Sequence, residues 1–392
     1  MVEGRSSLKA ILNKRHLLAK IGEEIGQEGM KKAEENPHSW RRPRPCGLTI
    51  HPGLGCPNAC LYCYVGDVLG TGPIEPRPLR LSGPELSYAL LLNPYFVPGR
   101  MGTFLAFGAI CDPFHPTLMG KTLDVMASVA SFLGNPMQFS TKMALGPELI
   151  EKLPGEAPIC PLITITTFEK ASELEPRAPS PWERLKTISE LRKAGFKPML
   201  FLRPLLPGLI EREVDAILLE AKRAGAIGVV VGALRVNKAI LHRLKRFGLY
   251  EAIIRRLKKY RTPLLSRKAL ITVPSSDLKK LVLETAGEVG LVGFRAACCA
   301  NAFVAGVPCT GLCWLKGFCS KCPNRCVEKL PDVQEEDIRK VLRIAFGLSA
   351  QVIRLERFKL FIRLKRPFAS EVLPAVKTVL EVATRRSVIL RT

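Results

Sequence analysis

The chain has 392 residues and is 47% hydrophobic, which is an ordinary globular composition and supports one large domain with smaller attachments. Its 59 lysines and arginines against 35 acidic residues give a formal charge of +24. This surplus favours nucleic acid as a partner, ahead of an anionic membrane surface or of simple solubility. No apolar run reaches the length of a membrane span, and the first residues carry charges where a signal peptide needs an apolar core, so we expect a cytoplasmic protein.

The thirteen cysteines are clustered. Three lie within residues 56–63 and seven within 298–326, while Cys46, Cys111 and Cys160 stand alone. Clustering of this kind favours metal ligation in a reducing compartment over a disulfide framework.

The amino-terminal segment is predicted to be a basic helical extension, residues 1–45, with an amphipathic helix over residues 5–33. Its apolar residues recur at helical spacings: Leu8, Ile11, Leu12, Leu18 and Ile21. We expect this helix to pack on the main domain, with guidance of a polyanion as the alternative. The Pro- and Arg-rich residues 39–47 then form a linker into the first strand.

The stretch GCPNACLYCYVG, residues 55–66, places Cys56, Cys60 and Cys63 in a C-x3-C-x2-C pattern. Metal sites completed by protein alone usually take four ligands, so three thiolates suit a [4Fe–4S] cluster with one iron left open to a small molecule. The alternatives are a zinc site completed by His51 or another cysteine, a disulfide pair, or thiols that serve only as small buried apolar groups.

These residues resemble the signature of radical S-adenosylmethionine (SAM) enzymes, C-x3-C-x-aromatic-C, with Tyr62 in the aromatic place. The resemblance implies that the open iron binds the amino and carboxylate groups of SAM. It also implies an electron donor, flavodoxin-like or ferredoxin-like, and reductive cleavage of SAM to a 5′-deoxyadenosyl radical that abstracts hydrogen from a substrate.

The next part of the chain alternates β-rich runs with helical patterns that end at glycine. Six strands are expected at residues 47–50, 103–110, 137–143, 161–168, 197–206 and 226–234. Such a series implies a parallel sheet with right-handed crossovers. The predicted fold is α/β, a partial (β/α)6 barrel over residues 46–296, which the radical SAM resemblance also implies.

Active sites of parallel barrels gather at the carboxyl ends of the strands. Polar side chains follow the predicted strands at those ends: Asp112, Thr141, Lys142, Thr164, Thr166, Thr167 and Arg203. The sequence therefore predicts a ligand site at this end of the barrel.

A wider resemblance covers about residues 46–235. The segments GCPNACLYCYV, CDPFHP, STKMALGPELIEKL, ITITTFEKASELEPRAPSPWERL and LFLRPLLPGL look like the spore photoproduct lyase-like branch of radical SAM proteins, often labelled DNA repair photolyases. The resemblance implies that Lys142 and Thr164 hold the SAM carboxylate. It also implies that Gly108 and Asp112 lie where the chain after the second strand runs beside the amino group or the ribose of SAM.

For several other polar residues the sequence leaves two possible roles open. We expect Arg203 to contact the ligand, with pairing to Glu173 or Glu175 as the alternative. Glu175 and Arg184 form a buried ion pair or touch cofactor or substrate. For His115, packing beside Pro116 is favoured over a role as proton donor.

The second cysteine field is assigned to a Cys-rich metal-binding segment, residues 297–330. Its candidate ligands are Cys309, Cys313, Cys319, Cys322 and Cys326, preceded by Cys298 and Cys299. A second [4Fe–4S] cluster is the first interpretation and structural zinc the alternative. A metal would order this Gly- and Pro-rich segment. A spare thiol here is also a candidate hydrogen donor to a substrate radical.

The last region, residues 331–392, is predicted to be a small basic α+β domain. Its Arg and Lys residues interleave with Phe358 and Phe361, as on a nucleic-acid-binding sheet face, although any half-exposed sheet can show this alternation. The favoured function is a radical SAM enzyme that repairs or modifies DNA or RNA. The alternatives are radical chemistry on a protein, peptide or small metabolite, and an iron–sulfur protein that binds nucleic acid without turnover.

Overall fold

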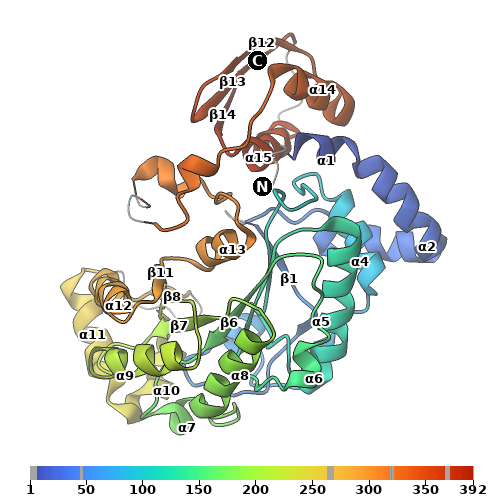
Figure 1. Cartoon of the computed structure of the whole chain (residues 1–392). Helices are drawn as coiled ribbons and strands as arrows, with labels where there is room; N and C mark the ends of the chain where they lie inside the picture. Colours follow the sequence, from blue (N-terminus) through green and yellow to red (C-terminus); the bar gives the residue numbers. More distant parts are fainter. Residues whose placement is uncertain are drawn as a thin grey trace.

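The main body of the molecule is a seven-stranded parallel sheet that curves into a partial barrel (Figure 1). The computed structural model describes residues 7–44, 47–262, 269–317, 319, 322–366 and 371–391. Across the sheet the strands are β1 (Leu48–Ile50), β4 (Leu105–Phe107), β5 (Met137–Thr141), β6 (Ile159–Thr164), β7 (Met199–Leu205), β8 (Gly228–Ala233) and β11 (Val292–Phe294). The predicted α/β partial barrel is confirmed.

Five of these strands fall within the runs expected from the sequence, β6 begins at Ile159, two residues before its expected run, and β11 was not expected. It is only three residues long and contains Gly293, so it carries little β signal; its place comes from parallel pairing with β8. β4 is shorter than expected because Gly108, at φ +95, turns the chain directly after Phe107.

Helices cover the outer face of the sheet. They are α4 (Gly83–Leu92), α5 (Pro116–Ser128), α6 (Pro147–Ile150), α8 (Pro181–Lys193), α9 (Ile210–Arg223) and α12 (Ser276–Glu288). Their starts follow from the sequence: α4 and α8 each begin with a capping box, Ser82 with Glu85 and Ser180 with Glu183, followed by proline in the first turn. Outward-facing strand residues pack with these helices in one large apolar core.

Shorter elements occupy the connections. These are α3 (Val65–Leu69), α7 (Ala171–Leu174), α10 (Lys238–Leu244), α11 (Leu249–Lys259), the pair β2 (Gly53–Leu54) and β3 (Arg77–Pro78), and the pair β9 (Arg235–Val236) and β10 (Ile271–Thr272). None of the helices within the described ranges is both long and apolar enough to cross a membrane.

The inner face of the sheet has two parts. Near the amino ends of the strands, Cys160, Met199 and Val230 pack against α13 (Ala297–Ala305), which carries Cys298 and Cys299. Nearer the carboxyl ends, Thr164 and Arg203 line an open cavity. The barrel interior is therefore filled at one end and hollow at the other.

The amino-terminal helix is split in two, α1 (Leu8–Leu12) and α2 (Lys14–Glu34), with a non-helical residue at Gly26. α2 packs along α4, and α1 reaches α14 and α15 of the carboxyl-terminal region (Figure 1). This is packing on the protein, as expected. Residues 1–6 and Cys46, which belong to the predicted extension and linker, lie outside the described residues.

A small separate domain follows the barrel. Its elements are α14 (Glu335–Phe346), β12 (Ala350–Leu355), β13 (Lys359–Leu364), α15 (Leu373–Thr384) and β14 (Ser387–Arg391), with strand order β12-β13-β14. An apolar core joins both helices to one face of this sheet. The predicted small α+β domain is confirmed.

Candidate active site

A cavity of about 170 Å³ lies at the carboxyl ends of β4 to β8. The cluster loop, residues 55–66, forms one wall, and the cysteines Cys56, Cys60 and Cys63 all face the cavity. Each cofactor contact proposed from the sequence also lines it: Tyr62, Gly108, Asp112, Lys142, Thr164 and Arg203. Residues from five separate strand ends are thus brought to one place.

The cluster loop is held by contacts that the sequence did not reveal. The Leu61 amide donates to the Leu174 carbonyl at 2.9 Å. From α10, Arg243 donates to the carbonyls of Leu61 and Cys63, both at 2.9 Å, and pairs with Asp67 at 2.9 Å. Because a carboxylate fixes the guanidinium and the guanidinium fixes two loop carbonyls, the position of the thiols is set from outside the loop.

The thiols of this loop are partly buried. Burial raises the pKa of Cys56 to about 11 and that of Cys60 to about 12. As the side chains stand, no three His, Cys, Asp or Glu residues of the described part come together closely enough to hold a metal ion. The donor set itself fits a cluster: three soft ligands on one short loop face a cavity, and binding a cation would convert the thiols to thiolates.

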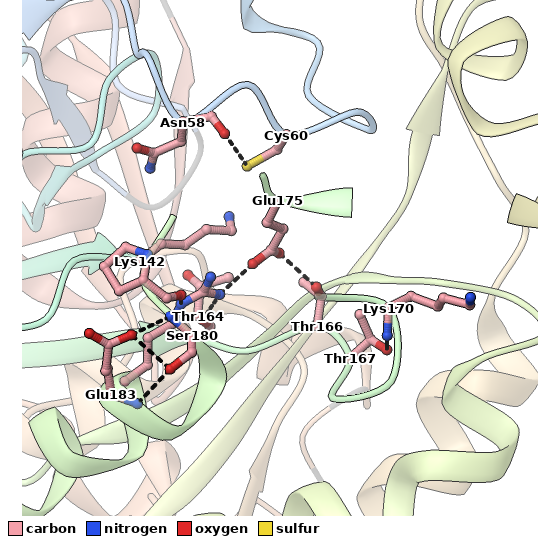
Figure 2. A network of polar contacts seen from close by, with 12 residues as sticks. Asn58, Cys60, Lys142, Thr164, Thr166, Thr167, Lys170, Glu175, Ser180 and Glu183 are labelled. Atoms are coloured by element: carbon pink, nitrogen blue, oxygen red, sulfur yellow. Dashed lines mark hydrogen bonds and ion pairs between the residues drawn. The ribbon is translucent and has the colours of Figure 1, made fainter. Parts of the chain in front are cut away.

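A buried polar network lies behind the loop (Figure 2). The Arg184 guanidinium pairs with Glu175 at 2.5 Å, and both side chains are essentially inaccessible. The Tyr62 hydroxyl and the Thr166 hydroxyl also donate to Glu175. Glu175 and Arg184 are therefore an ion pair, one of the two interpretations left open by the sequence. The ion pair therefore fixes Tyr62. It also fixes Thr164, because the Arg184 guanidinium donates to the Thr164 carbonyl at 3.1 Å.

Lys142 completes the electrostatics of this region. Its ammonium lies over the Tyr62 ring, 5.5 Å from the centroid, and points toward Cys60 in Figure 2. Burial alone would lower the pKa of Lys142, but Cys60 and Glu175 outweigh burial and raise it. Burial alone would likewise raise the pKa of Glu175, but Lys142 and Arg184 hold it below its usual value. A partly buried positive charge is thus held at the edge of the cavity, beside the thiols.

Asp112 makes hydrogen bonds to neighbouring residues of the protein. Its carboxylate accepts from the Thr141 hydroxyl at 2.5 Å and from the Lys142 amide at 2.8 Å, which joins the ends of β4 and β5. At Gly108 a Cβ atom would lie 2.5 Å from the Ser140 carbonyl oxygen, so only glycine fits there. Both residues line the cavity, and the Asp112 carboxylate fixes the backbone amide of Lys142 where the chain leaves β5.

The remaining polar residues near the strand ends separate into two groups. Arg203 lines the cavity and pairs with neither Glu173 nor Glu175, since Glu173 binds Lys170 at 2.7 Å and Glu175 binds Arg184. His115 lies outside the cavity lining and caps α5 by accepting from the Thr117 amide. Thr166 and Thr167 are buried and bond within the protein.

Several residues that line the cavity were not predicted from the sequence, among them Tyr64, Cys111, Phe201 and Arg235. Arg235 follows β8, so the rule of strand ends would have found it. Cys111 precedes Asp112; burial raises the pKa of its thiol to about 12, which keeps the S–H bond intact. Cys111 is thus a protonated thiol inside the cavity and separate from the C-x3-C-x2-C triad.

The second cysteine field lies at the opposite end of the barrel. Cys309 and Cys326 are buried together with Phe104, which precedes β4, whereas Gly108 at the far end of that strand lines the cavity. Four residues of extended chain span about 13 Å. None of the cysteines of residues 298–326 lines the cavity. The lining of this cavity therefore gives no support to the prediction that a spare thiol of this field donates hydrogen to a substrate radical.

A partial parallel barrel with C-x3-C-x-aromatic-C in its first connection, facing a cavity at the carboxyl ends of the strands, is the fold of radical SAM enzymes, and this chain has that fold. It resembles the structure of a spore photoproduct lyase variant with bound AdoMet and dinucleoside spore photoproduct. The TM-score is 0.52 at 16% identity, over 68% of this chain and 84% of that one. A second variant gives a TM-score of 0.50 over 62% and 75%.

The sequence relatives of the chain are distant. No protein-family model matches the chain. It is 25% identical over 208 residues to an uncharacterized protein of Mycobacterium tuberculosis and to one of Mycobacterium bovis, and covers 60% of their length with 49% of its own. An uncharacterized protein of Acidianus two-tailed virus is 23% identical over 173 residues. The chain thus spans 60% of the length of these mycobacterial relatives and 56% of that of the viral one.

Proposed function

We propose that this protein is a radical SAM enzyme that abstracts hydrogen from a nucleic acid and so repairs or modifies it. One observation supports the radical SAM assignment: Cys56, Cys60 and Cys63 converge with the partly buried Lys142 on one cavity at the carboxyl ends of the strands. Cys56, Cys60 and Cys63 would hold a [4Fe–4S] cluster, and such a cluster would supply the electron that cleaves SAM to a deoxyadenosyl radical.

The chain's own residues bind and orient. Lys142 provides a partly buried cation for the carboxylate of SAM, and the Thr164 hydroxyl provides a donor beside it. Glu175 and Arg184 hold Tyr62 and the Thr164 carbonyl, so the wall behind the cofactor is rigid. Arg203 in β7 and Arg235 after β8 place two further cations in the cavity lining, where they suit an anionic substrate.

The thiol of Cys111 suits a further role in the same cavity. A substrate radical formed there needs a hydrogen atom if the product is to leave in a closed-shell form, and the S–H of Cys111 is held protonated within the lining. Cys111 replaces the cysteines of residues 298–326 as the proposed donor.

The nucleic acid assignment is supported by charge and by one sheet face. The face of β12-β13-β14 away from the helices carries two rows across the strands. These rows are Arg354–Phe361–Ile389 and Val352–Arg363–Arg391. Arg354 lies 4.4 Å from the centroid of the Phe361 ring and also pairs with Glu356 at 3.2 Å. Arginines bind phosphates, and a partly exposed aromatic ring such as that of Phe361 can stack on unpaired bases.

Phe358, grouped with Phe361 in the sequence analysis, is not part of this face. It turns toward the Cys-rich segment, where its ring meets Trp314 edge-on at 5.3 Å. The proposed surface is therefore smaller than the run of Arg and Lys residues suggested, and single-stranded nucleic acid is the partner that it fits.

Two assays test the proposal. Anaerobic reconstitution followed by dithionite reduction should yield 5′-deoxyadenosine from wild type and none from the Cys56/Cys60/Cys63→Ala variant. Zinc without iron in the wild-type protein would refute the radical chemistry.

The substrate is tested separately by nucleic acid binding at several salt concentrations. Arg354→Ala/Arg363→Ala should weaken binding to single-stranded DNA or RNA and reduce the salt slope by about 1 to 2. The matched control, Arg212→Ala/Arg223→Ala, removes two exposed arginines from α9 and should leave binding unchanged. Equal loss in both variants would favour the alternative substrates, a protein, peptide or small metabolite.

A further inference from the structure

The second cysteine field gathers its thiols at a junction of three parts of the molecule. Cys309 and Cys326 are buried in one cluster with Phe104 of the barrel and Phe358 of the carboxyl-terminal domain. The Cys309 amide donates to the Cys326 sulfur at 3.3 Å, and the Gly311 amide donates to the Cys309 sulfur at 3.3 Å. Amide donors aimed at sulfur stabilise thiolates and are typical of the surroundings of metal-bound cysteine.

Two further cysteines of the segment lie near this pair. Cys319 packs against the same cluster, and the Cys322 amide donates to the Cys319 carbonyl at 3.0 Å in a tight turn. As the side chains stand, no three of these thiols are close enough together to hold a metal ion, so metal binding would draw them inward. Thiols drawn together in this way ionise together only when a cation compensates their charge.

A side chain from the carboxyl-terminal domain already provides part of that compensation. Arg385, which follows α15, is completely buried. Its guanidinium donates only to backbone carbonyls, those of Pro308, Val382 and Gly102. Within the described ranges it makes no ion pair with a carboxylate. Burial lowers the pKa of Arg385 to about 10, and Cys309 and Cys326 act against this effect.

A buried arginine without a carboxylate is costly unless another negative group lies near it. Four thiolates bound to a zinc ion, or to a [4Fe–4S] core in its 2+ state, carry a net charge of −2 in either case. A complex of that charge would accept the Arg385 guanidinium as its counterion. The same arginine bonds to Gly102 of the barrel and to Pro308 of the Cys-rich segment, so one group links all three parts.

Hydrogen-bond donors around the sulfurs also suit a negatively charged metal–thiolate complex. The Asn324 amide donates to the Cys326 sulfur at 3.2 Å, and the Lys329 ammonium holds the Asn324 oxygen at 2.8 Å. Asn324 is itself almost fully buried. Its orientation is thus fixed so that its N–H, and not its carbonyl, meets the sulfur.

We propose that Cys309, Cys319, Cys322 and Cys326 hold a second metal centre, at the end of the barrel opposite to the SAM cavity, and that this centre with Arg385 fastens the carboxyl-terminal domain to the barrel. The site is independent of the radical chemistry. It takes a soft cationic centre, and metal analysis distinguishes zinc from an iron–sulfur cluster.

The first test counts metal in a background that lacks the first centre. The Cys56/Cys60/Cys63→Ala chain, prepared anaerobically, should retain about four iron with matching sulfide, or about one zinc, per chain. Adding Cys319→Ser/Cys322→Ser should remove this metal, whereas adding Cys160→Ala, a buried cysteine in the barrel interior, should not. Absence of metal from the folded triple variant, or its persistence after Cys319→Ser/Cys322→Ser, would overturn the proposal.

The second test addresses Arg385 without removing a ligand. Arg385→Gln should release the metal to a chelator at least about tenfold faster than the parent chain, and Arg385→Lys should restore part of the difference because it keeps the charge. Hydrogen exchange in α15 and β14 should rise together with metal loss. Equal release rates in the parent and in Arg385→Gln would show that the arginine does not serve as the counterion.

Discussion

The two cysteine groups of this protein occupy opposite ends of one barrel and differ in what surrounds them. The triad Cys56, Cys60 and Cys63 faces an open cavity lined by polar residues of several strand ends. Cys309 and Cys326 are enclosed by apolar side chains and a buried arginine at a contact between domains. Openness suits a centre that exchanges ligands, and enclosure suits one that holds parts together.

The largest difference should appear in SAM cleavage. Cys56/Cys60/Cys63→Ala should reduce 5′-deoxyadenosine formation to background, because the cluster has no other ligands in the loop. Cys319→Ser/Cys322→Ser should keep cleavage within severalfold of wild type while lowering the melting temperature, because its thiols lie outside the cavity. Chromatographic detection of deoxyadenosine and calorimetry measure the two effects. A complete loss of cleavage in the second variant would show that the two ends are functionally coupled.

The buried ion pair behind the triad should dominate local stability. Glu175→Ala leaves the Arg184 guanidinium buried without its carboxylate and should cost about 3–5 kcal/mol of unfolding free energy. The double variant Glu175→Leu/Arg184→Met removes both charges and should recover most of that loss. Urea unfolding of the three proteins checks this. A double variant as unstable as Glu175→Ala would mean that the loss comes from packing and not from the unpaired charge.

A smaller effect is expected at the lysine beside the triad. Lys142→Ala should weaken SAM binding by about 10–100-fold, which corresponds to the loss of one charged hydrogen bond of about 1.5–3 kcal/mol. Lys170→Ala is the control, because Lys170 is exposed and pairs with Glu173 on the outside of the cavity. Calorimetric titration with SAM under anaerobic conditions compares the two. Similar affinities in both variants would remove Lys142 from the cofactor site.

The smallest effect is expected in the dependence of unfolding free energy on acidic pH. Lys142 and Arg184 hold the pKa of Glu175 below its ordinary value of 4.5, so its contribution to stability is complete above that pH and is lost as the pH falls through the lowered value. Unfolding free energy should therefore decline below about pH 4.5 more steeply in wild type than in Glu175→Gln. Parallel curves for the two proteins would show that other carboxylates dominate acid unfolding.

The sequence determined the elements that depend on local pattern. The spacing of Cys56, Cys60 and Cys63, the alternation of strands with capped helices, and the polar residues Asp112, Lys142 and Thr164 at strand ends were all readable, because parallel topology places such ends together. The ordered α+β pattern of the last region was readable for the same reason.

Only the tertiary structure decided which distant residues meet. Arg243 is far in sequence from the loop carbonyls that it holds, and Arg385 lies 77 residues after Pro308. Neither arginine lies in a recognisable sequence motif. The packing of whole helices and strands, and not the spacing of residues along the sequence, decides which carbonyls each arginine meets. The same holds for the short strand β11 and for the separation of the two cysteine groups, which follow from the closure of the sheet and the filling of its interior by α13.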